Sequence, residues 1–123
     1  MRPDGYECHG TLVWNVAIER RRTAWGHVLA FASLGHEWLV VDPHFRWTET
    51  YVLDPPAFDA WVRDLATRAR IWRIAGGREC PALAGPFCVG TVKRLIGLRS
   101  GAFTPAGLER DLRRSGATRE FVR

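Results

Sequence analysis

The feature that most constrains the fold is a series of short apolar segments in the first half of the chain, separated by turn residues. The segments are rich in branched and aromatic side chains, a composition typical of β-strands. Turns are indicated at Leu34-Gly35 and at the proline-marked sites Asp42-Pro43 and Asp54-Pro55-Pro56. The pattern predicts an antiparallel meander with strands over residues 11–20, 25–33, 37–43 and 45–53.

Helical periodicity follows in the second half. Asp54 is placed to cap a helix entered through prolines, with an apolar stripe that includes Phe58 and Leu65. A further strand is predicted over 70–77, an apolar helix over 88–96 that stops at Gly97, and a helix over 104–116 capped by Thr104. We therefore expect one α+β domain over residues 1–123, an antiparallel sheet with helices gathered at the C-terminal end.

Composition narrows the class of protein. The 123 residues are 46% hydrophobic, which favours a folded globule with a real core. No stretch approaches a membrane span, and the polar N-terminus does not predict a secretory signal. Three cysteines cannot all pair within the chain, so we expect reduced thiols and a cytoplasmic protein, or a virion-associated one if phage-encoded. We expect no membrane partner, no cofactor and no metal, because Cys8-His9 lacks a paired ligand motif.

The hairpin over 25–43 brings a histidine near a carboxylate. With a two-residue turn at Leu34-Gly35, the numbers of facing residues sum to 69, so His27 faces Asp42 on one side of the sheet. A turn one residue longer would point Asp42 away from His27. A carboxylate beside an imidazole can orient the ring and stabilise its protonated form. We expect His36 and His44, in contrast, to be solvated.

Cys88 stands where the apolar helix begins, directly after Pro86-Phe87. The unpaired N–H groups and the dipole at a helix N-terminus favour the thiolate, and a neighbouring imidazolium favours it further. Backbone N–H groups near Phe87 and Cys88 could hold an oxyanion, and Trp25 could line a substrate cleft. The candidate site is therefore Cys88, His27 and Asp42 as catalytic residues, with Trp25 and Phe87 as substrate-binding residues.

Two segments resemble the NlpC-type papain-like cysteine peptidases, "HVLAFASLGHEWLVVDP" and "CVGTVKRLIGLRSGAFTPAGL". That family has a catalytic Cys at the start of a helix and a catalytic His at the start of a hairpin, whose return strand supplies a polar residue. Here the hairpin precedes the helix, as in the circularly permuted branch of the superfamily. Val89 stands where the family commonly has Ser. Small uncharacterised proteins of phages and proteobacteria carry a similar Cys-Val helix.

The resemblance implies a peptidase or amidase-type thiol hydrolase in which Cys88 attacks, His27 is base and acid, and Asp42 orients His27. Peptide or amide substrates would follow. Cys88 is also explained as a buried structural thiol, since free cysteines are commonly buried. The fold would then be a non-catalytic interaction module with a protein partner. A third reading comes from the net charge of +5, with Arg20–Arg22 and the C-terminal helix binding nucleic acid.

Overall fold

The computed structural model describes residues 13–19, 26–44, 46–75, 88–98 and 100–121. Within them the chain forms six strands and three helices: β1 (Val13–Glu19), β2 (His27–Ser33), β3 (Trp38–Pro43), β4 (Thr48–Leu53), α1 (Pro55–Ala66), β5 (Ala69–Ala75), α2 (Cys88–Ile96), α3 (Pro105–Arg114) and β6 (Thr118–Glu120). None of the helices in this part of the chain is long and apolar enough to cross a membrane.

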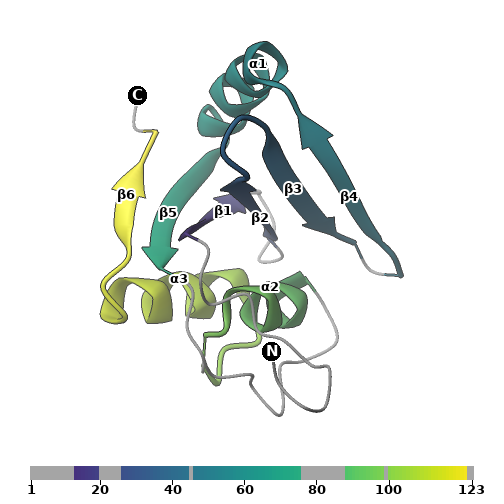
Figure 1. The fold of residues 1–123 in the computed structure, drawn as a ribbon. Helices are drawn as coiled ribbons and strands as arrows, with labels where there is room; N and C mark the ends of the chain where they lie inside the picture. Colours follow the sequence, from purple (N-terminus) through teal and green to yellow (C-terminus); the bar gives the residue numbers. More distant parts are fainter. Residues whose placement is uncertain (1–12, 20–25, 45, 76–87, 99, 122–123) are drawn as a thin grey trace, which may run out of the picture.

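The strands form one antiparallel sheet in the order β4-β3-β2-β1-β5-β6 (Figure 1). The first four strands are the predicted meander. The chain then passes through α1 from the β4 edge to β5, which pairs with the other side of β1. Strand β6 extends the β5 edge and was not predicted. The α+β class and the antiparallel sheet are thus confirmed.

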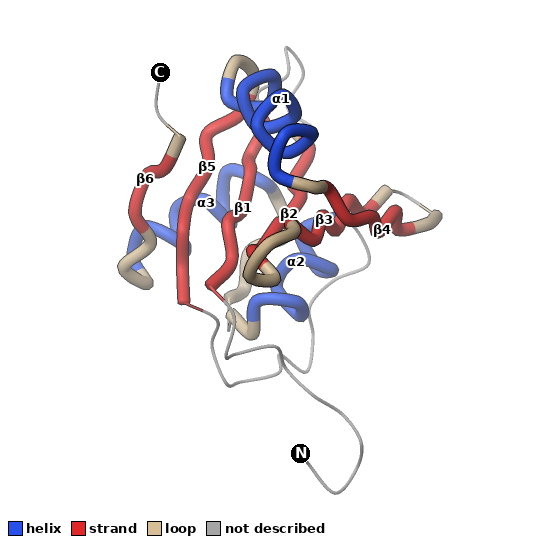
Figure 2. Tube along the Cα trace, turned by 45° about the horizontal axis from the view of Figure 1, so that its top comes forward, coloured by secondary structure: helices blue, strands red, loops and turns tan. Residues whose placement is uncertain are grey.

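Helices cover both faces of the sheet, rather than gathering only at the end of the chain. On one face, α1 packs through Phe58, Val62 and Leu65 against Ala17, Phe31 and other apolar side chains of the sheet. On the other face, α2 and α3 pack on Trp14, Val16 and Val28 and their neighbours. Figure 2 shows α1 on one side of the strands and α2 with α3 on the other. Because both faces of β1 and β2 are covered, these strands are apolar along almost their whole length.

Local signals placed two helix starts and one helix end correctly. The Asp54 carboxylate accepts a hydrogen bond from the N–H of Ala57 at 2.9 Å, and the Thr104 hydroxyl accepts one from Gly107 at 3.1 Å. Prolines occupy the first turn of both helices, where a missing N–H costs nothing. Gly97, with φ 66°, follows the last residue of α2 in the left-handed conformation that ends many helices.

The predicted two-residue turn between β2 and β3 is wrong. Ser33 pairs with Trp38, so the loop comprises residues 34–37 and the numbers of facing residues sum to 71 rather than 69. The loop is closed by Leu34 N–H donating to the Glu37 carbonyl at 2.8 Å, with Gly35 at φ 107°. A change of two in this sum leaves every side chain on its predicted face. The partners are therefore displaced, but the side of the sheet they share is kept.

Candidate functional site

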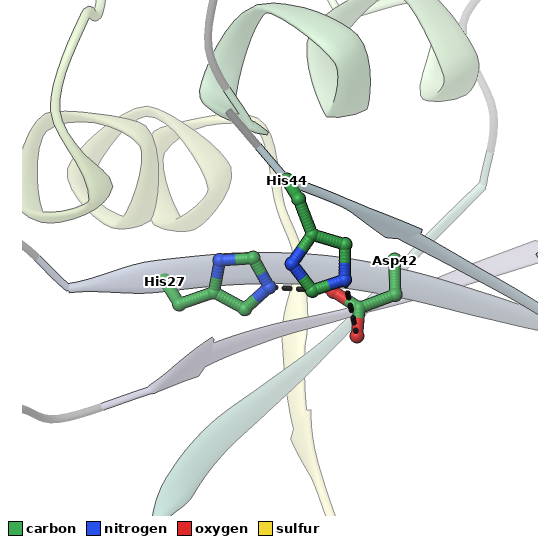
Figure 3. A group of neighbouring side chains, drawn as sticks. All are labelled: His27, Asp42 and His44. Carbon is green, nitrogen blue, oxygen red and sulfur yellow. Dashed lines mark hydrogen bonds and ion pairs between the residues drawn. The ribbon is translucent and has the colours of Figure 1, made fainter. Parts of the chain in front are cut away.

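His27 and Asp42 meet where β2 and β3 have stopped pairing. The last paired residues are Ala30 and Val41, and both site residues lie beyond them toward the same end of the sheet. In the register of the paired part, His27 and Asp42 are diagonal rather than directly opposed, a separation that long side chains can bridge. His27 Nε2 lies 2.5 Å from Asp42 Oδ1 (Figure 3). A carboxylate can only accept, so Nε2 carries the hydrogen and donates it.

Cys88 approaches His27 from the helical layer. It is the first residue of α2, is half-buried and carries a free thiol. The thiol lies close enough to the His27 imidazole and to the backbone of Val28 and Val89 for each of them to lower its pKa. Because Asp42 occupies Nε2 of the ring, Nδ1 is the nitrogen left for Cys88. The imidazole therefore links the thiol to the carboxylate.

The electrostatics of the pair favour its charged form. The hydrogen bond with Asp42 contributes most to raising the pKa of His27, to about 9; the bond with Cys88 and the charges of both partners add to it, and burial opposes it. Burial raises the pKa of the Cys88 thiol. The hydrogen bond with His27, the backbone of Val28 and Val89, and the charge of His27 outweigh burial, so that this pKa is lowered. A lowered thiol pKa and a raised imidazole pKa together favour thiolate beside imidazolium.

This arrangement can perform nucleophilic chemistry. A thiolate is the reactive form of cysteine, and an imidazolium in contact with it can deliver a proton to a leaving group. The start of α2 also supplies N–H groups with no partner inside the helix, which suit an oxyanion. The side chains of His27 and Asp42 are 17% and 19% exposed, so the pair is sheltered without being sealed from solvent.

His44 is a member of this cluster that sequence reasoning missed. We expected it in solvent, yet its side chain is only 30% exposed and its ring stacks on that of His27, with centroids 5.6 Å apart and planes 23° apart. The overlooked signal was the spacing of Asp42 and His44. Residues two apart on an extended segment project to the same face.

Among the described residues, His27, Asp42 and His44 form a group that could hold a metal ion. One ligand atom from each of His27, Asp42 and His44 lies within 4.8 Å of the others. Two imidazoles and a carboxylate suit zinc or a similar transition metal. The Nε2 of His27 is, however, engaged with Asp42 Oδ1, so a metal bound through this nitrogen would compete with that contact.

The remaining candidates lie outside the described residues. These are the proposed substrate-binding residues Trp25 and Phe87, the cysteines Cys8 and Cys80 with His9, and the basic run Arg20–Arg22. The structure brings together the three candidate catalytic residues and adds His44 to them.

Comparison of the chain with protein-family models, with curated proteins and with solved structures gave no significant match in any of the three.

Proposed function

We propose that the protein is a thiol hydrolase of the peptidase or amidase type, with a circularly permuted papain-like fold. The observation that carries the proposal is the 2.5 Å His27–Asp42 hydrogen bond beside the Cys88 thiol, which helps to raise the pKa of His27 while His27 lowers that of Cys88. The order of the segments supports the permuted assignment, because the histidine hairpin precedes the cysteine helix while the side chains still meet. A triad is defined by its geometry and not by its order along the chain.

In the proposed reaction the Cys88 thiolate attacks the carbonyl carbon of an amide, isopeptide or thioester. The C–S bond forms as the carbonyl oxygen becomes an oxyanion, held by N–H groups at the start of α2. The oxyanion collapses, the bond to the leaving group breaks, and the His27 imidazolium gives its proton to the departing amine or thiol. Neutral His27 then takes a proton from water, which attacks the acyl-enzyme and releases the acid and the thiol.

Asp42 has a separate task in this scheme. Its hydrogen bond to Nε2 fixes the orientation of the His27 ring and stabilises the imidazolium while it holds the proton. The reaction needs a reduced thiol, so we place the protein in a reducing compartment such as the cytoplasm, or in a virion if it is phage-encoded. The substrate class is a peptide or another acyl amide.

The first test is the pH dependence of Cys88 alkylation by iodoacetamide, followed by peptide mass spectrometry. Cys8 and Cys80 serve as internal references, and His27→Ala is compared with His36→Ala, an exposed histidine in the β2–β3 loop. We expect Cys88 to react at pH values below those an ordinary thiol requires, about 8.5, and His27→Ala to abolish this advantage. With a substrate in hand, His27→Ala should lower turnover by about 10²–10⁴-fold.

An ordinary pH profile for Cys88, unchanged by His27→Ala, would refute the hydrolase. The same fold acting as a non-catalytic interaction module would then be the better proposal. Nucleic-acid binding is distinguished from both alternatives by measuring affinity at increasing salt concentration, because contacts with phosphates weaken steeply with added salt. Two α3 arginines already have partners within the chain: Arg110 Nε lies 3.3 Å from Asp111 Oδ1, and Arg113 lies over Trp72.

A further inference from the structure

The His27–Asp42 hydrogen bond is overlaid by the ring of His44. In the view of Figure 3, His44 lies across the line that joins the two residues. The stacking of the two imidazoles shows that this overlap is a true contact. His44 follows β3 directly and comes two residues after Asp42. The ring of His44 therefore lies against the His27–Asp42 pair.

The polar edge of His44 is turned inward. Its Nε2 is buried and has no hydrogen-bond partner, although it lies 3.6 Å from Asp42 Oδ2 and 3.3 Å from Glu49 Oε1. Asp42 Oδ2 is the carboxylate oxygen that does not accept from His27. If His44 were simply a solvated residue of the loop between β3 and β4, its Nε2 would be exposed to water.

The outer face of His44 is covered in turn by Trp47. The two rings stack with centroids 4.8 Å apart and planes 19° apart, and the backbone N–H of His44 donates to the backbone carbonyl of Trp47 at 2.7 Å. The Trp47 indole is 58% exposed, and its N–H donates to Glu49 at 3.4 Å. The rings of Trp47, His44 and His27 thus form a stack that leads from solvent to the candidate site.

We propose that His44 is a positioning residue of the proposed hydrolase, a cover that keeps water from the His27–Asp42 hydrogen bond. The inference rests on the proposed function for its role in a reaction. The physical basis is that an ionic hydrogen bond is stronger where water is excluded, because the effective dielectric constant is lower. A covered carboxylate then holds the imidazole in one orientation toward Cys88.

The other charged groups near His27 do not cover the His27–Asp42 hydrogen bond. Glu19 lies opposite His27 in the β1–β2 register, with Oε1 3.7 Å from Arg68 Nε. Cys88 approaches from α2, and Glu49 lies opposite Asp42 in the β3–β4 register, with Oε1 3.3 Å from His44 Nε2. Among these groups, His44 alone stacks on the His27 ring.

The test measures how fast the His27 Nε2 proton exchanges with water. Cys88→Ala protein with ¹⁵N-labelled histidine is studied by NMR near pH 6, and the signal is assigned by its loss in His27→Ala. We expect slow exchange in the parent and exchange at least about tenfold faster in His44→Ala, as for a site opened to solvent. His44→Phe restores a ring without the nitrogen and should restore most of the protection. His36→Ala is the matched control and should change nothing.

Three outcomes would overturn the cover: unchanged exchange in folded His44→Ala, no rescue by His44→Phe, or an equal effect of His36→Ala. Circular dichroism and thermal melting identify a variant that has lost its fold. If His44→Ala does not fold, His44→Gln replaces it, because glutamine keeps a polar side chain without a ring. The His27 Nε2 proton should then exchange as fast in His44→Gln as is expected for His44→Ala. The NMR experiment does not involve the thiol. The alkylation experiment can therefore refute the hydrolase without refuting the role of His44 as a cover. The NMR experiment can likewise refute that role even if the Cys88 thiol is activated.

Discussion

At the scale of single residues, the site depends on how His27 and Cys88 change each other's ionisation. Asp42 holds a proton on His27, and the resulting imidazolium favours the thiolate of Cys88. The two shifts have opposite effects on stability. The raised pKa of His27 stabilises the fold at low pH, whereas the lowered pKa of Cys88 stabilises it at high pH. Only a variant that lacks the thiol separates these contributions.

We predict that Cys88→Ala protein loses stability as the pH rises. His27 has an ordinary pKa near 6.5 in the unfolded chain and a raised one, about 9 in the parent, in the folded protein. Its contribution is therefore complete below about pH 6.5 and is lost as the pH rises toward about 9. It amounts to at most about 3 kcal/mol, and less once the bond to Cys88 is gone. Urea unfolding at a series of pH values measures it.

Adding Asp42→Asn to Cys88→Ala should remove this pH dependence, because Asp42 is the main cause of the raised pKa. Asp59→Asn, on the exposed side of α1, makes the same chemical change away from the site. It should leave the dependence intact. If the Cys88→Ala, Asp42→Asn variant still lost stability with rising pH, a group other than Asp42 would have to cause the raised pKa of His27.

At the scale of secondary-structure elements, local signals were sufficient and longer-range ones were not. The apolar segments, Asp54 and Thr104 identified all elements up to α3 because each signal acts within a few residues. The short strand β6 has no pattern of its own and exists through pairing with β5. Likewise, nothing in the sequence states that β5 pairs with β1, since such contacts depend on the whole sheet.

The site could be predicted in part for the same reason. The periodicity of β-strands placed His27 and Asp42 on one face whether the loop held two residues or four. The length of that loop depends on the Leu34–Glu37 hydrogen bond, which the sequence does not reveal. The two-residue spacing of Asp42 and His44 indicates a shared face, but the stacking of His44 on His27 and Trp47 depends on how the chain leaves β3. This is tertiary packing, which a sequence pattern does not encode.

The link between α2 and α3 yields a prediction about Lys93. This α2 side chain is completely buried, and its ammonium donates to the carbonyls of Ser100 at 2.9 Å and Ala102 at 2.7 Å. Burial lowers the pKa of Lys93. Lys93→Met keeps the volume but leaves both carbonyls without this donor, so we expect a loss of about 1–3 kcal/mol in the free energy of unfolding.

Chemical denaturation of Lys93→Met measures this loss, with Arg94→Met as the control. Arg94 is the next residue of the same helix and is exposed. Its substitution should change stability by no more than about 0.5 kcal/mol. Equal stability of the two variants would mean that the free energy lost by desolvating the Lys93 ammonium equals the free energy gained from its hydrogen bonds.

At the scale of the whole molecule, the site and the attachment of α3 are separate parts of a sheet that has helices on both faces. The site is formed by the ends of β2 and β3 with the start of α2. Helix α3 is joined to β5 by Glu109, which accepts from Arg70 at 2.6 and 2.5 Å and from the Trp72 indole at 2.8 Å. These residues are far apart in sequence and lie toward the other edge of the sheet from β3. A substitution at the α3–β5 contact should therefore lower the stability of the fold without changing the reactivity of Cys88.

Glu109→Gln tests this separation. Glu109 is 7% exposed, and the hydrogen bonds from Arg70 and Trp72 outweigh burial to lower its pKa, so the carboxylate is charged when it pairs with Arg70. A neutral amide leaves the guanidinium without its counter-charge, which should cost about 1–3 kcal/mol, less than for a fully buried pair because Arg70 is partly exposed. Thermal melting should show this loss against Glu37→Gln, an exposed glutamate in the β2–β3 loop. The pH profile of Cys88 alkylation should stay that of the parent. A shifted profile in folded Glu109→Gln would mean that α3 helps to set the geometry of the site.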